Sequence, residues 1–230
     1  MDFIEKVPDI TVILDIPKGT VLTERDIATL MMYNEKLDFY VSINNLHDTK
    51  AYAEMGLRFY WPFPITSYYE LQGIIALNPA YILLGPPLSF DLNTVRAITN
   101  IPVRLYANAS YDPYIPRENG ICGQWIRPED VKLYEPYVEV LEFVDCGLTK
   151  ESTLLHVYKE NQTWPGNLNL LLDNFNFNVD NRVIPEDLGE RRLNCRQRCM
   201  SGGSCHRCIS ALQFAELIRK KHEEQRLNQQ

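Results

Sequence analysis

The feature that most constrains the fold is a regular alternation of short apolar runs with helix-type segments, which continues from the start of the chain to Asp145. Several of the runs are almost continuously apolar or aromatic, as is typical of strands that are covered on both faces. They predict strands at Thr11–Ile16, Phe39–Ile43, Arg58–Trp61, Tyr81–Leu84, Val103–Ala107 and Val138–Val144.

The segments between these runs have the character of helices, and the fifth opens with a proline followed by two acidic residues, a favourable first turn. They predict helices at Thr23–Tyr33, Thr49–Met55, Ser67–Leu77, Leu92–Ile98 and Pro128–Tyr134. Repeated strand–helix alternation predicts a parallel sheet. About six units are present, whereas a complete barrel needs eight. We therefore predict an α/β fold, an incomplete or irregular TIM-type (β/α) barrel, with an open doubly wound sheet as the alternative.

The alternation stops near Asp145, and this change predicts the domain organisation. We expect residues 1–148 to form the barrel-like domain and residues 149–230 to form a C-terminal helical extension packed on the barrel. Helices are predicted in the extension at Lys150–Glu160, Pro185–Arg192 and Ile209–Arg226. In a fold of this kind, functional residues lie just after the carboxyl ends of the strands.

The extension holds four of the six cysteines of the chain, in a C-x3-C-x5-C-x2-C pattern that we call the cysteine knuckle: Cys195, Cys199, Cys205 and Cys208. Two glycines between the ligand pairs allow the tight backbone that wraps a metal. Four thiolates suit a structural Zn²⁺ and an iron–sulfur cluster equally, so the spacing predicts a metal and leaves its identity open. Cys122 and Cys146 lie outside this pattern. For each of them the sequence leaves three roles open: an extra ligand, a reactive thiol or a buried neutral cysteine.

The charge of the chain is unevenly distributed. Its formal net charge is −7, which argues against a protein that grips nucleic acid over its whole surface. One basic region surrounds the knuckle and contains Arg191, Arg192, Arg196, Arg198, Arg207, Arg219, Lys220 and Lys221. These residues either offset the negative charge of the thiolates or form an anion-binding surface, the Arg191–Lys221 patch, that could contact RNA or DNA.

No run approaches 18 consecutive apolar residues, so no membrane-spanning helix is expected. The first residues lack the basic start and long apolar stretch of a secretory signal. We therefore expect a cytoplasmic protein, in which clustered cysteines bind metal or carry out redox chemistry.

Three segments resemble one family, in the family's order: Pro102–Ser110 (PVRLYANAS), Asn119–Val144 (NGICGQWIRPEDVKLYEPYVEVLEFV) and Leu193–Cys208 (LNCRQRCMSGGSCHRC). They are similar to the collagenase-like peptidases, peptidase family U32. The resemblance implies a barrel-like domain, a [4Fe–4S] cluster on four cysteines, and oxygen-independent hydroxylation of ubiquinone precursors or RNA bases. The family's Lys-Ile-x-Gly-Arg stretch is replaced here by residues 142–147, without lysine or arginine, as in a short divergent member.

The first functional hypothesis is therefore an iron–sulfur enzyme, or enzyme subunit, that hydroxylates or otherwise modifies an organic or nucleic-acid substrate. An anionic substrate would meet Arg104 and Arg127, with Asn108 and Gln124 adding hydrogen bonds, because a guanidinium binds a carboxylate with two parallel bonds. The alternative is a structural role for Arg127, in which it pairs with Glu129 or Asp130.

Three other functions remain open. A zinc-stabilised barrel could act as a binding or assembly protein, or as a subunit completed by a partner. A nucleic-acid modifying subunit would dock through the Arg191–Lys221 patch. A peptidase is the third, although no H-E-x-x-H or G-x-S-x-G motif is present and only Cys122 with His47 suggests a nucleophile and base.

Overall fold

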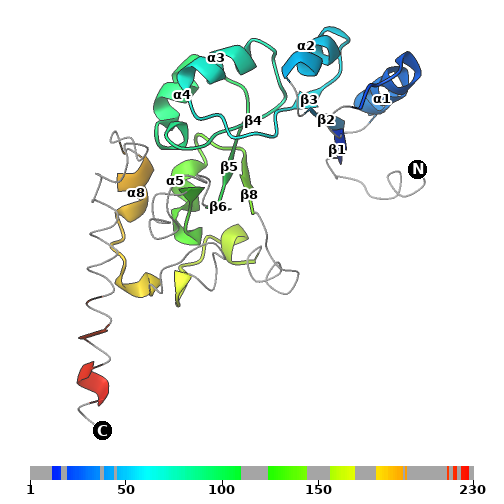
Figure 1. The fold of residues 1–230 in the computed structure, drawn as a ribbon. Coiled ribbons are helices and arrows are strands. Elements are labelled where there is room, and N and C mark those ends of the chain that lie inside the picture. Colours follow the sequence, from blue (N-terminus) through cyan, green and yellow to red (C-terminus); the bar gives the residue numbers. More distant parts are fainter. Residues whose placement is uncertain are drawn as a thin grey trace. The chain divides into compact units, whose positions relative to one another are not determined.

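The computed structural model describes residues 12–16, 20–36, 39–43, 46–109, 124–143, 156–168, 180–193, 195, 217, 220, 221 and 224–227. These residues divide into two compact units (Figure 1). Unit 1 comprises the chain up to Leu83 together with Thr99–Val103, and unit 2 comprises Leu84–Ile98 and the chain from Arg104 onward.

Unit 1 is built on a parallel sheet in chain order. Strands β1 (Val12–Ile16), β2 (Phe39–Ile43) and β3 (Phe59–Tyr60) lie side by side, with Val12 opposite Phe39 and Val41 opposite Phe59. A further parallel bridge joins Tyr60 to Tyr81, just before β4 (Ile82–Leu83). Strands that are adjacent in sequence are therefore adjacent in the sheet.

The helices of unit 1 follow the strands as strand–helix alternation predicts. They are α1 (Glu24–Lys36), α2 (Leu46–Glu54) and α3 (Tyr68–Ile75), and both α1 and α2 pack on β2 (Figure 1). The start of α3 is fixed by Ser67, whose hydroxyl accepts a hydrogen bond from the amide of Glu70 at 3.2 Å. Apolar side chains from these elements, and from the turn between α2 and β3, form the core of the unit: Ile16, Leu30, Val41, Tyr52, Leu57 and Phe59.

Unit 2 contains the strands and helices that carry the candidate site. Strand β5 (Val103–Tyr106) pairs in parallel with β8 (Val140–Glu142), and β6 (Asn108–Ala109) pairs in antiparallel fashion with β7 (Gln124–Trp125). The helical elements are η2 (Leu88–Phe90), α4 (Leu92–Ile98), η4 (Pro128–Asp130), α5 (Val131–Tyr134), η5 (Asn181–Val183) and α8 (Leu188–Leu193). Helix α8 packs on α5 and on η2.

The six predicted strands and the helices before Asp145 are confirmed, β2 and α4 at the predicted bounds and most of the other strands shorter than the runs that predicted them. The helix expected at Pro128–Tyr134 is divided into η4 and α5. In the extension, α8 lies within and just beyond the helix expected at Pro185–Arg192, and residues 156–159 are helical. The barrel itself and the division at residue 148 stay predictions, because a parallel sheet of this size is compatible with an open or a closed arrangement.

Candidate functional site

The candidate site begins at a turn that joins strand β7 to the helical segment after it. The amide of Ile126 donates to the carbonyl of Ala107 at 2.9 Å, which extends the β6–β7 pairing by one residue. Arg127 then adopts extended backbone angles and Pro128 opens η4, a position where its missing amide costs nothing. The turn places Trp125, Ile126 and Arg127 in the interior, where each is 3% exposed or less.

A buried ion pair holds this turn closed. The Nε and Nη2 atoms of Arg127 donate to the two carboxylate oxygens of Asp130 at 2.6 and 2.9 Å. The Nη2 atom also donates to the backbone carbonyl of Glu186 at 3.1 Å, and Nη1 lies 3.6 Å from the carboxylate of Glu129. This bidentate geometry is the stronger form of an arginine–carboxylate contact, and it fixes the guanidinium against movement.

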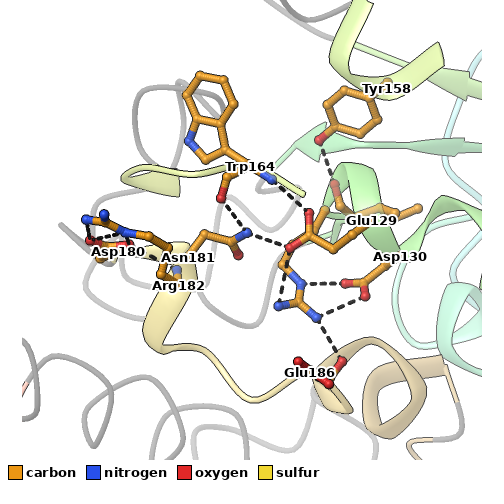
Figure 2. A network of polar contacts seen from close by, with 10 residues as sticks. Glu129, Asp130, Tyr158, Trp164, Asp180, Asn181, Arg182 and Glu186 are labelled. Atoms are coloured by element: carbon orange, nitrogen blue, oxygen red, sulfur yellow. Dashed lines mark hydrogen bonds and ion pairs between the residues drawn. The ribbon is translucent and has the colours of Figure 1, made fainter. Parts of the chain in front are cut away.

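Glu129 ties two distant segments to the same turn. One carboxylate oxygen accepts from Nδ2 of Asn181 at 2.5 Å, and the other accepts from the amide of Trp164 at 3.4 Å (Figure 2). Nδ2 of Asn181 also donates to the carbonyl of Trp164 at 3.0 Å. Nearby, the hydroxyl of Tyr158 donates to the carbonyl of Ile126 at 2.6 Å (Figure 2). Residues 156–168 and 180–193 are therefore anchored on the segment 125–130.

Arg192 adds an aromatic contact to this network. Its guanidinium carbon lies 3.9 Å from the ring centroid of Trp125 and 5.3 Å from that of Phe90, within the range of a cation–π interaction. Its Nη2 atom is 3.4 Å from the carbonyl of Trp125, and the residue is 3% exposed. Since Arg192 is buried, it does not belong to the surface of the Arg191–Lys221 patch, and the prediction was wrong for this residue. Its neighbour Arg191 is exposed and pairs with Asp187.

Burial sets the protonation of two neighbouring groups. Burial raises the pKa of Asp130 above its ordinary value, and the bonds from Arg127 oppose this shift. Burial raises the pKa of the Tyr134 hydroxyl to about 12, although a hydrogen bond with Arg192 acts in the other direction. Tyr134 therefore stays protonated at neutral pH.

Of the knuckle, the structure describes the first cysteine. Cys195 is partly buried and follows α8, and its amide donates to the carbonyl of Arg192 at 3.1 Å. Cys199, Cys205 and Cys208 lie outside the described residues, as do Cys122 and Cys146. In the part of the chain that is described, no three His, Cys, Asp or Glu side chains are grouped as metal ligands. The donor set of four thiolates nevertheless fits Zn²⁺ or an iron–sulfur cluster, and its first member starts from an ordered helix end.

The four predicted substrate-binding residues all lie in unit 2. Arg104 is on β5, is buried, and pairs with Glu142 on β8, whereas Arg127 is engaged as described above. Asn108 and Gln124 belong to the paired strands β6 and β7, so their backbones are neighbours. Burial raises the pKa of Glu142 to about 7. Each arginine thus has a carboxylate partner within the protein. For Arg127 this is the alternative to substrate binding that the sequence left open, pairing with Glu129 or Asp130.

Sequence reasoning did not anticipate the contacts of Tyr158, Trp164 and Asn181 with this turn, and it placed Arg192 in the basic region without its contact to Trp125. The signal for Arg192 was present, because it lies four residues after Leu188 in α8, and residues at that spacing share a helix face. The role of Asn181 had no such signal, since its partner Glu129 is 52 residues away.

Comparisons with models of protein families, with curated proteins and with solved structures gave no match to this chain. Among the residues described, no helix is long and apolar enough to cross a membrane.

Proposed function

We propose that this chain is an iron–sulfur protein resembling peptidase family U32, in which Cys195, Cys199, Cys205 and Cys208 hold a [4Fe–4S] cluster. Its proposed activity is the oxygen-independent hydroxylation, or a related modification, of an anionic organic or nucleic-acid substrate. One observation carries the proposal. Arg192, which immediately precedes the segment 193–208, packs on Trp125 of the segment 119–144, and its backbone carbonyl accepts a hydrogen bond from the amide of Cys195.

This contact supports the proposal because the two segments are far apart in the chain. Trp125 and Arg192 are separated by 67 residues, and their contact attaches the chain just before the segment 193–208 to the segment 119–144. The helix end that carries the first cysteine is thereby attached to the strand and turn that carry the predicted substrate residues Gln124 and Arg127.

Different residues have different roles in the proposed activity. The cluster, when bound, supplies one-electron redox chemistry. The four thiolates hold it, and the basic residues around the knuckle offset their negative charge. Asn108 and Gln124, on the paired strands β6 and β7, are the residues proposed to add hydrogen bonds to the substrate. An anionic substrate at Arg104 would compete with Glu142 for the guanidinium, so anion binding there is coupled to loss of that ion pair.

The test is the metal content of protein purified without oxygen. We expect a brown protein with broad absorption near ~400 nm that dithionite bleaches, and about four iron and four sulfide per chain. Cys195→Ser should abolish the colour, whereas Cys122→Ser, a cysteine outside the knuckle, should leave it unchanged. A colourless protein that holds one zinc would refute the cluster.

A zinc-stabilised binding or assembly protein is the second candidate, and a specific observation favours it. Both predicted substrate-binding arginines, Arg104 and Arg127, are buried and paired with Glu142 and Asp130, as in a structural role. In that case the metal contributes to folding rather than to chemistry. Tight binding of one zinc, with loss of the folded extension after chelation, would establish this candidate in place of the enzyme.

A further inference from the structure

The end of helix α8 connects the interior of unit 2 to the first metal ligand. Arg192 stands in the last turn of this helix with its side chain directed inward over Trp125 and Phe90. Its backbone carbonyl accepts the hydrogen bond from the amide of Cys195. The same residue therefore contacts the protein interior through its side chain and the knuckle through its backbone.

The inward direction of Arg192 follows from the packing of the helix. Leu188, one turn earlier, is 1% exposed and lies on the same face. Gly189 allows the helix to approach η4 closely, because a Cβ atom at this position would lie 2.5 Å from the carboxylate carbon of Asp130. A guanidinium stays charged when buried, so it needs compensating contacts, and here the two rings and the carbonyl of Trp125 supply them.

We propose, on the basis of the metal-holding function above, that Arg192 is a positioning residue for the cysteine site. By fixing the last turn of α8 on Trp125, it holds the backbone from which the Cys195 thiolate extends. A ligand that is held in place before the metal arrives loses less conformational freedom on binding, so the site binds its metal more tightly. Arg192 does not touch the metal in this proposal, and it acts through the position of Cys195.

The experiment compares Arg192→Met with Arg191→Met in the full chain. The two variants lose the same charge at adjacent positions of one helix, but Arg192 is buried and Arg191 is exposed. Zn²⁺ serves as the probe, since four thiolates bind it whether or not the native group is a cluster. Affinity is measured by competition with a chromophoric chelator, and the cobalt–thiolate absorption reports the coordination. We expect Arg192→Met to weaken Zn²⁺ binding by about 10- to 100-fold, and Arg191→Met to bind as the wild type does.

A second readout separates positioning from a merely structural role. If Arg192 only stabilises the fold, Arg192→Met lowers the Tm equally with and without Zn²⁺, and the metal-induced increase in Tm is unchanged. If it positions the site, that increase becomes smaller and the cobalt spectrum changes. Should Arg192→Met fail to fold, Arg192→Lys is compared with Arg191→Lys, since lysine keeps a cation near Trp125 but loses the planar fork. We expect weaker binding for Arg192→Lys alone.

The outcomes distinguish this proposal from the proposed function. Equal Zn²⁺ affinity in the Arg192 and Arg191 variants, with normal binding by the wild type, overturns the role of Arg192 and leaves the metal site intact. A wild-type chain that binds neither zinc nor iron overturns both.

Discussion

The buried pair between Arg127 and Asp130 provides the sharpest test of how this protein is held together. We consider Asp130→Asn, which keeps the size of the side chain and one carbonyl oxygen but removes its charge. Asp130 is 5% exposed and Arg127 is 2% exposed, so neither group exchanges its partner for bulk water. After the substitution a charged guanidinium remains inside the protein with weaker acceptors.

The expected loss of stability follows from the remaining contacts. Removing one partner of a buried ion pair costs about 3–5 kcal/mol. Arg127 would keep the carbonyl of Glu186 at 3.1 Å and the carboxylate of Glu129 at 3.6 Å, which places the loss near the lower limit. Burial already disfavours the charged form of Asp130, as its raised pKa indicates, and asparagine avoids that cost. We therefore expect a loss of about 3 kcal/mol, or about 6–12 °C in Tm for a chain of this size.

Urea unfolding followed by tryptophan fluorescence measures this loss, because Trp125 lies two residues before Arg127 and Trp164 is hydrogen-bonded to Glu129 in the same turn. The matched control is Asp187→Asn, the same substitution in the exposed Asp187–Arg191 pair, whose side chains are 50% and 61% exposed. Exposed pairs contribute about 1 kcal/mol or less. If the two variants lose the same free energy of unfolding, the buried pair does not hold the turn.

Three further substitutions test other parts of the structure. Gly189→Ala should lose about 1–3 kcal/mol through overpacking against Asp130, and Asp130→Ala should relieve most of that loss in a double-mutant cycle. Tyr158→Phe should lose about 1 kcal/mol in urea unfolding, because a buried backbone carbonyl loses its donor at 2.6 Å, and no change would contradict this bond. Thr23→Ala should destabilise unit 1, since the hydroxyl accepts from the amide of Asp26 and caps α1. The amide and hydroxyl of Thr23 also donate to the carboxylate of Asp26, which lowers the pKa of Asp26. The stabilisation from these bonds is present above pH ~3.8 and is lost as the pH falls through the lowered folded-state pKa. The loss of stability caused by Thr23→Ala should therefore be smaller in acid, and an unchanged loss would refute the role of the Asp26 carboxylate.

Most of the elements before Asp145 could be predicted because their signals are local. The apolar run Phe39–Ile43 located β2 at its observed bounds, and the helix expected at Ser67–Leu77 contains α3. The strands β6 and β7 were missed because two-residue strands carry no periodic pattern, and their pairing joins residues that a long loop separates.

The direction of the charged side chains was much harder to predict. The sequence left Arg127 open between binding a substrate and pairing with Glu129 or Asp130, and the structure places it in the pair. It grouped Arg192 with the surface residues near the knuckle, whereas the structure buries it over Trp125. Whether a metal is bound, and which one, stays a prediction from the cysteine spacing and the family resemblance.

The sequence alone determined the alternation of strands and helices, because periodicity is a property of neighbouring residues, and the spacing of the four knuckle cysteines predicts a metal site for the same local reason. Only the tertiary structure decided which charges are buried and with which partners. The reason is that burying a charge depends on what packs over it, and here the covering groups come from far away: Glu186 lies 59 residues after Arg127, and Arg192 lies 67 residues after Trp125.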